Sequence, residues 1–144
     1  MTRDELEKYY IDTRYVVFID DVKVNCKINE TLPSSVNDII SKDKTAALLT
    51  AWNPRSQLLS SKENAKRNGL LHFYLKQQGY TVFKALGQGS DDNWPAEESY
   101  FIIGITKEEA EQLAVEYQQN AFVWFEADKN VMLEFSQIWL SSLT

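Results

Sequence analysis

Hydrophobic and polar residues alternate along the chain with periods of about two and about 3.6, which predict an order of strands and helices. Apolar and polar residues alternate from Val22 to Ile28, which is typical of a strand with one solvated face. Thr45 to Trp52 is almost wholly apolar, as in a covered strand. The same reasoning predicts helices over about 3–10, 34–41, 61–78 and 107–117, and strands over 14–19, 22–28, 45–52, 80–86, 99–105, 121–127 and 131–135.

Three of these helices begin with the sequence of a capping box, in which a Ser or Thr is followed three residues later by Glu. The boxes begin at Thr2, Ser60 and Thr106. The long central helix is expected to end before Gly79, which suits the left-handed position after a helix.

The order of elements predicts an α+β fold. From Thr45 to Ala127 the order is strand, helix, strand, strand, helix, strand, as in a ferredoxin-like split β-α-β-β-α-β core with an antiparallel sheet. An N-terminal helix plus hairpin and a C-terminal hairpin would extend this core. With no linker in the sequence, we expect residues 1–144 to be a single domain, with 1–43 packed on the 44–136 core.

The expected chain direction brings the longest polar segments to one end of the sheet. These segments are the Asn53-Pro54-Arg55-Ser56 turn, the beginning of the long helix, the loop from Gly87 to Glu98, and residues 118–120. Asn64 and Arg67 lie on or beside the helix stripe that carries leucine further along. Either that part of the helix overhangs solvent, or its polar groups meet the loops.

Composition excludes several classes of function. The net charge is −6 and no basic stripe is present, so binding to duplex nucleic acid is not expected. No apolar run approaches the roughly 20 residues of a membrane span, and the charged N-terminus is unlike a signal peptide. A single cysteine fits a reducing compartment. We therefore expect a cytoplasmic protein without a membrane partner.

Known catalytic and cofactor signatures are missing from the sequence. Zinc sites need three or four His and Cys ligands, and the chain has one of each. Gly87-Gln88-Gly89 follows a strand but precedes no helix, unlike a dinucleotide fingerprint. We expect no metal and no cofactor. Whether the protein is an enzyme stays open, with Glu98 as the candidate acid or base.

Several spaced segments resemble a known family. They are Ala51 to Ser56, then Ser60, Asn64 and Arg67, then Trp94-Pro95 with Glu98-Ser99, then Gln118 to Ala121. Together they resemble an uncharacterised bacterial family, the domain of unknown function numbered three-two-nine-three, over about Thr45 to Trp124. The Pro95 to Glu98 segment is one residue longer than the family pattern, which leaves the roles of Glu97 and Glu98 open. The resemblance implies a bacterial origin and no established activity.

Two functions remain open from the sequence. The first is a polar pocket for an anionic or nucleotide-like small ligand, in which the guanidinium groups of Arg55 and Arg67 would bind the negative charge and Trp94 would stack on a ring. The second is a non-catalytic protein-protein interaction or inhibitor module, with Trp139-Leu140 or the Phe122/Trp124 strand as contact. The same polar cluster could instead be scaffolding. The oligomeric state is not predicted. The candidate ligand-binding residues are Asn53, Arg55, Ser56, Asn64, Arg67, Trp94, Glu98, Ser99 and Gln118.

Overall fold

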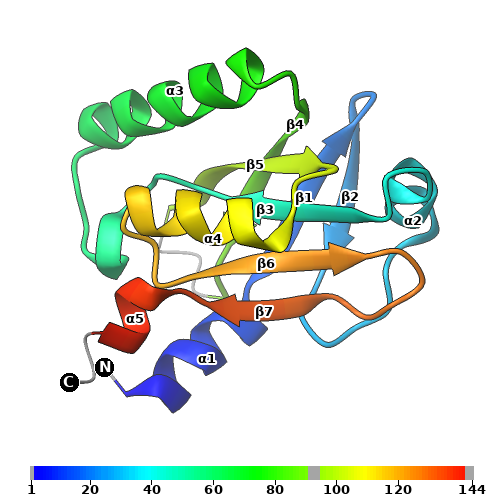
Figure 1. Ribbon diagram of the computed structural model, residues 1–144. Helices are drawn as coiled ribbons and strands as arrows, with labels where there is room; N and C mark the ends of the chain where they lie inside the picture. Colours follow the sequence, from blue (N-terminus) through cyan, green and yellow to red (C-terminus); the bar gives the residue numbers. More distant parts are fainter. Residues whose placement is uncertain (1, 91–94, 142–144) are drawn as a thin grey trace.

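The strands of the protein form one antiparallel sheet in the order β2-β1-β4-β5-β3-β6-β7 (Figure 1). A computed structural model describes residues 2–90 and 95–141. The strands are β1 (Arg14–Ile19), β2 (Val22–Cys26), β3 (Thr45–Leu49), β4 (Thr81–Gln88), β5 (Glu97–Ile103), β6 (Ala121–Glu126) and β7 (Met132–Phe135).

Helices flank this sheet on both sides. They are α1 (Arg3–Asp12), α2 (Ser34–Ile40), α3 (Ser61–Gln77), α4 (Lys107–Glu116) and α5 (Gln137–Ser141), with a 3₁₀ turn, η1 (Pro54–Ser56), after β3. Figure 1 shows α3 and α4 together on one face of the sheet. The sequence did not predict α5, because five residues are too few for a helical period to be recognised.

Successive residues of β3 enter two different hydrophobic cores. Ala46 and Leu48 belong to a core with the β1–β2 hairpin and α2. Ala47 and Leu49 belong to a core beneath α3 and α4. All four side chains are buried, so the strand reads as a continuous apolar run because both of its faces are covered.

The predicted helix beginnings are present. The side chains of Thr2, Ser60 and Thr106 each accept a hydrogen bond from the backbone N–H three residues later. The long helix α3 is followed by Gly79, whose φ of 81° is the left-handed conformation expected there.

The α+β class and the antiparallel sheet are confirmed. The four strands between residues 45 and 126 lie in the order β4-β5-β3-β6, all neighbours antiparallel. The N-terminal hairpin extends this sheet through the β1–β4 pair, and β7 extends it beside β6. The β4–β5 ladder continues as far as Gly87↔Glu97, so the expected Gly87–Glu98 loop is shorter than predicted.

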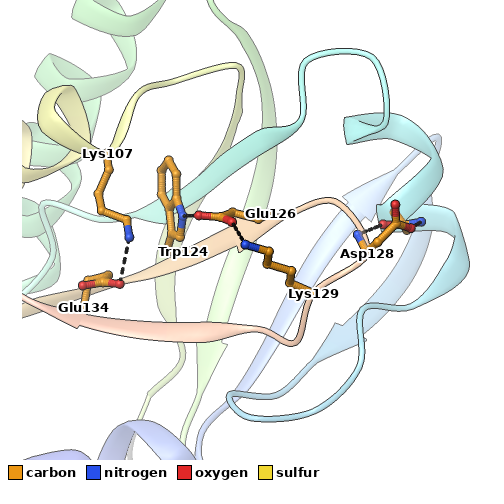
Figure 2. Close-up of polar contacts among 7 residues, drawn as sticks. Lys107, Trp124, Glu126, Asp128, Lys129 and Glu134 are labelled. Atoms are coloured by element: carbon orange, nitrogen blue, oxygen red, sulfur yellow. Dashed lines mark hydrogen bonds and ion pairs between the residues drawn. The ribbon is translucent and has the colours of Figure 1, made fainter.

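Polar side chains on and beside the β6–β7 hairpin contact one another at the surface (Figure 2). Trp124 Nε1 donates to Glu126 at 3.0 Å, and the same carboxylate pairs with Lys129 at 2.8 Å. Lys107 pairs with Glu134 at 3.3 Å. Such exposed pairs add little stability, typically about 0–1 kcal/mol each. Among the described residues, no helix is long and apolar enough to cross a membrane.

Candidate functional site

A buried asparagine pair organises the turn after β3. Asn53 has the left-handed φ of 46° and is 5% exposed. Its backbone N–H donates to Asn64 Oδ1 at 2.8 Å, and its Oδ1 accepts from Asn64 Nδ2 at 2.7 Å. The same Oδ1 accepts from the backbone N–H of Leu59 at 3.1 Å. The first turn of α3 is thus polar because its side chains bind the preceding loop.

One turn further along α3, Asn68 repeats this arrangement. Its Oδ1 accepts from the backbone N–H of Ala51 at 2.8 Å, and its Nδ2 donates to the carbonyl of Glu98 at 2.7 Å. Asn68 is 2% exposed. The carbonyl of Glu98 also accepts from the Thr50 hydroxyl at 2.6 Å. These bonds join the end of β3 to the beginning of β5.

The guanidinium of Arg67 is held by backbone carbonyls. Its Nε donates to Ala51 O at 2.9 Å and its Nη2 to Tyr117 O at 2.6 Å. No ion pair joins Arg67 to Glu98 among the described residues. Arg67 therefore connects β3, α3 and the end of α4.

The residues after α4 meet the same turn. Arg55 N donates to Gln118 O at 2.7 Å, and Asn120 Nδ2 donates to Ser56 Oγ at 3.1 Å. Gln119 Nε2 donates to Trp52 O at 3.1 Å and to Tyr117 O at 3.2 Å. The polar segments that the sequence placed at one end of the sheet thus lie together there.

A cavity of about 490 Å³ lies on the other side of this turn, between α1 and the end of the sheet. Its volume falls within the roughly 300–1,000 Å³ that is typical of small-ligand sites. A smaller chamber of about 30 Å³, which has room for about one water, shares four lining residues with this cavity: Tyr9, Tyr10, Glu97 and Gln119. We call the larger space the outer cavity and the smaller one the inner chamber. The outer cavity is lined by Glu5, Leu6, Lys8, Tyr9, Tyr10, Asp12, Asn53, Ser56, Gly89, Ser90, Glu97 and Gln119.

Glu97 lines both the outer cavity and the inner chamber. Its Oε1 accepts from Asn53 Nδ2 at 3.1 Å, and it makes no ion pair among the described residues. Burial raises the pKa of this carboxyl to about 7, against the opposing effect of the Asn53 hydrogen bond. Glu97 can therefore exchange a proton near neutral pH.

Three tyrosines surround this carboxyl. The rings of Tyr9 and Tyr10 on α1 pack edge to face, with centroids 5.6 Å apart. Burial, and then the charge of Glu97, raise the pKa of Tyr9 to about 12 and that of Tyr10 further. Tyr15 on β1 is 5% exposed, and among the described residues its buried hydroxyl makes no hydrogen bond of good geometry, although the Thr13 side chain lies near enough to oppose the rise that burial causes in its pKa.

The charge lining the cavity is acidic. Glu5, Asp12 and Glu97 face one cation, Lys8, whose Nζ lies 2.9 Å from Asp12 Oδ2. Glu97 is also the one charged residue lining the inner chamber among the described residues. The described residues contain no group of three or more His, Cys, Asp or Glu that could hold a metal ion.

The residues predicted from the sequence divide into four groups. Asn53 and Ser56 line the outer cavity, and Ser99 lines the inner chamber, where its hydroxyl donates to Glu97 O at 3.2 Å. Asn64 and Arg67 bind the loops instead. Arg55, Glu98 and Gln118 are exposed and do not line the cavity. Trp94 lies outside the described residues.

Sequence reasoning missed the cavity residues of α1 and chose Glu98 over its neighbour Glu97. A signal for Glu97 was present, because residues two apart on a strand share a face. Glu97 therefore lies on the face of the buried Ser99 and Phe101. Nothing in the sequence placed Tyr9 and Tyr10 against this strand.

Comparison with known proteins identifies a family and no activity. A sequence model of the family described as "Protein of unknown function (DUF3293)" matches residues 49–122. No curated protein and no solved structure matches the chain.

Proposed function

This chain belongs to the DUF3293 family, whose description assigns no activity, and from its cavity we propose that it binds a small polar molecule between α1 and the end of the sheet. One observation carries the proposal: the partly buried carboxyl of Glu97 lines a ligand-sized cavity and makes no ion pair among the described residues. Carboxylates withdrawn from solvent are normally paired, so an unpaired one with a raised pKa at a cavity wall favours a binding role.

The cavity favours a neutral or cationic ligand over the anionic or nucleotide-like ligand expected from the sequence. Arg67 already serves two carbonyls, and Arg55 lies outside the lining. Anion binding through Arg55 stays a prediction. If the protein is an enzyme, Glu97 is a better candidate than the exposed Glu98 for the acid or base, because it faces the cavity and titrates near neutral pH.

A metabolite panel tests the proposal by thermal shift and ligand-observed NMR. The matched variants are Ser90→Trp, which places a large ring at the rim, and Lys76→Trp, which places the same ring on exposed α3. We expect at least one compound to stabilise the wild type and Lys76→Trp but not Ser90→Trp. If Ser90→Trp binds every hit as tightly as the wild type, the ligand does not occupy this cavity.

A second candidate function is protein interaction, which one surface favours. Leu70 and Phe73 on α3 are 56% and 65% exposed, and Lys66 beside them makes no ion pair among the described residues. The contact residues expected from the sequence are poor candidates, because Phe122, Trp124 and Trp139 are buried. Phe73→Ser should abolish recovery of a protein partner that binds this surface, and a partner retained by that variant would exclude this surface.

We also propose the ferredoxin-like core, the single domain and the cytoplasmic, bacterial origin that the sequence predicts. The strand order β4-β5-β3-β6 supports a ferredoxin-like core, and the β1–β4 pairing supports one domain in which residues 1–43 pack on 44–136. A cytoplasmic, bacterial protein is consistent with the family resemblance and with a single cysteine, Cys26, which is a buried free thiol. Chemical denaturation followed by Trp fluorescence and by far-UV dichroism should give coincident transitions for one domain.

A further inference from the structure

Resting on the ligand-binding function proposed above, we propose that the ligand carries a primary ammonium group, which enters the inner chamber and donates to Glu97, Gln119 and Tyr15. The rest of the ligand would occupy the outer cavity, against Tyr9 and Tyr10.

Gln119 offers an acceptor whose orientation is fixed by the fold. Its Nε2 donates to Trp52 O and Tyr117 O, at 3.1 and 3.2 Å. The amide group is therefore oriented, and its Oε1 is left without a hydrogen bond among the described residues. Gln119 is 6% exposed and lines both the outer cavity and the inner chamber.

Tyr15 and Glu97 offer two further acceptors. Among the described residues the Tyr15 hydroxyl is buried without a hydrogen bond of good geometry, although an unpaired buried hydroxyl costs about 1–3 kcal/mol. Glu97 accepts from Asn53 through Oε1, and no described residue donates to its Oε2. A primary ammonium has three N–H donors, so Glu97, Gln119 and Tyr15 together match its hydrogen-bonding capacity.

The size of the chamber distinguishes between kinds of ammonium group. Its volume of about 30 Å³ admits a group the size of one water. A primary ammonium has that size, whereas a trimethylammonium does not. A carboxylate or phosphate of the ligand would be both too large and repelled by Glu97. The outer cavity, with Leu6 and the two tyrosine rings, suits a partly apolar tail.

Four probes that share a short alkyl tail and differ in their polar group test the proposal: butylamine, N,N,N-trimethylbutylammonium, butanol and butyrate. Binding is followed at pH 8 by NMR shifts of the backbone amides of Tyr15, Glu97 and Gln119, which detect millimolar affinities. We expect butylamine to bind at least about tenfold tighter than the other three probes. Equal or tighter binding of any of those three would overturn the ammonium assignment.

Two conservative variants locate the ammonium group. Glu97→Gln keeps the size of the side chain and an oxygen for Asn53, and should weaken butylamine about tenfold or more. Tyr15→Phe removes only the hydroxyl and should weaken butylamine a few-fold, with an unchanged amide spectrum elsewhere. If both variants bind butylamine like the wild type, the ammonium does not occupy the inner chamber.

The pH dependence separates paired charges from neutral hydrogen bonds. The titratable and charged groups on the same cavity walls are Tyr9, Tyr10, Glu5, Lys8 and Asp12 of α1 and Tyr15 of β1. Butylamine should bind more tightly as pH rises from 6 to 8, because Glu97 then loses its proton. Tighter binding at pH 6 would contradict the charge pairing.

The metabolite panel distinguishes this inference from the general function. Hits confined to compounds without an amine, blocked by Ser90→Trp, would overturn the ammonium assignment while the binding site stands. If neither the panel nor butylamine binds, both the site and the ligand class fail.

Discussion

Asn53 and Glu97, 44 positions apart in the chain, are joined by a hydrogen bond of 3.1 Å on the wall of the cavity. The two ends of the Asn53 side chain have different tasks. Its Oδ1 accepts from the backbone of Leu59 and from Asn64, which fixes the turn after β3. Its Nδ2 donates to the partly buried carboxyl of Glu97, which lines both parts of the cavity. The scaffold of α3 and the candidate binding site therefore share a residue.

Asn64→Ala should strongly destabilise the protein. The substitution removes both hydrogen bonds between Asn64 and Asn53, and it leaves the buried backbone N–H of Asn53 without its acceptor. An unsatisfied buried group costs about 1–3 kcal/mol, so we expect a loss of roughly 2–4 kcal/mol in the free energy of unfolding. Urea denaturation measures it, with Lys66→Ala on the same helix as a control that changes stability by less than about 0.5 kcal/mol. A neutral Asn64→Ala would show that the network is not needed for folding.

Arg67→Ala should lower the melting temperature in the absence of any ligand. Its guanidinium makes two short bonds to the carbonyls of Ala51 and Tyr117, and charged hydrogen bonds contribute about 1.5–3 kcal/mol each. Arg67→Lys keeps the charge but not the planar fork, so it should recover only part of the loss. An Arg67→Ala protein that melts like the wild type but loses a ligand would instead assign Arg67 to binding.

Glu97 should make stability depend on pH between about 4.5 and 7. Its pKa in the folded protein is about 7, above the ordinary value of 4.5, so the folded state keeps a proton that the unfolded state releases. The contribution of Glu97 is fully present below pH 4.5 and is lost as pH rises to 7, a difference of up to about 3 kcal/mol. Denaturation of the wild type and Glu97→Gln across this range measures it. Parallel curves for the two proteins would rule out the raised pKa.

Tyr15→Phe should stabilise the unliganded protein slightly. Among the described residues the hydroxyl is buried without a hydrogen bond of good geometry, so its removal relieves a desolvation cost of about 1 kcal/mol while the ring keeps its packing. Thermal unfolding measures the change, with Tyr10→Phe as a comparison from the partly exposed α1 pair. A loss of 1 kcal/mol or more would mean that the hydroxyl is already satisfied.

Much of the fold could be predicted because local signals agreed with the tertiary structure. Thr2, Ser60 and Thr106 marked three helix beginnings, and the apolar run from Thr45 marked a strand covered on both faces. Chain direction then brought the Asn53 turn, α3 and the residues after α4 together. The polar residues of α3 were recognised as an anomaly in the sequence, and Asn64, Asn68 and Arg67 each bind the loops.

The cavity could not be predicted, because it depends on where α1 packs. Neither Tyr9 nor Tyr10 carries a sequence signal for contact with β5, and helix packing is a tertiary property. The choice of Glu98 over Glu97 was a register question, since one residue of difference moves a side chain to the opposite face of a strand.

The most direct test of a binding site built around Glu97 is the titration of its own carboxyl. With the glutamate Cδ carbons labelled and Glu97 assigned by comparison with Glu97→Gln, ¹³C NMR measures this pKa in the free protein. An enclosed, unpaired carboxyl should titrate at about 7 and fall by one unit or more on saturation with butylamine. A free-protein pKa near 4.5, unchanged by the amine, would contradict both the buried charge and its proposed use.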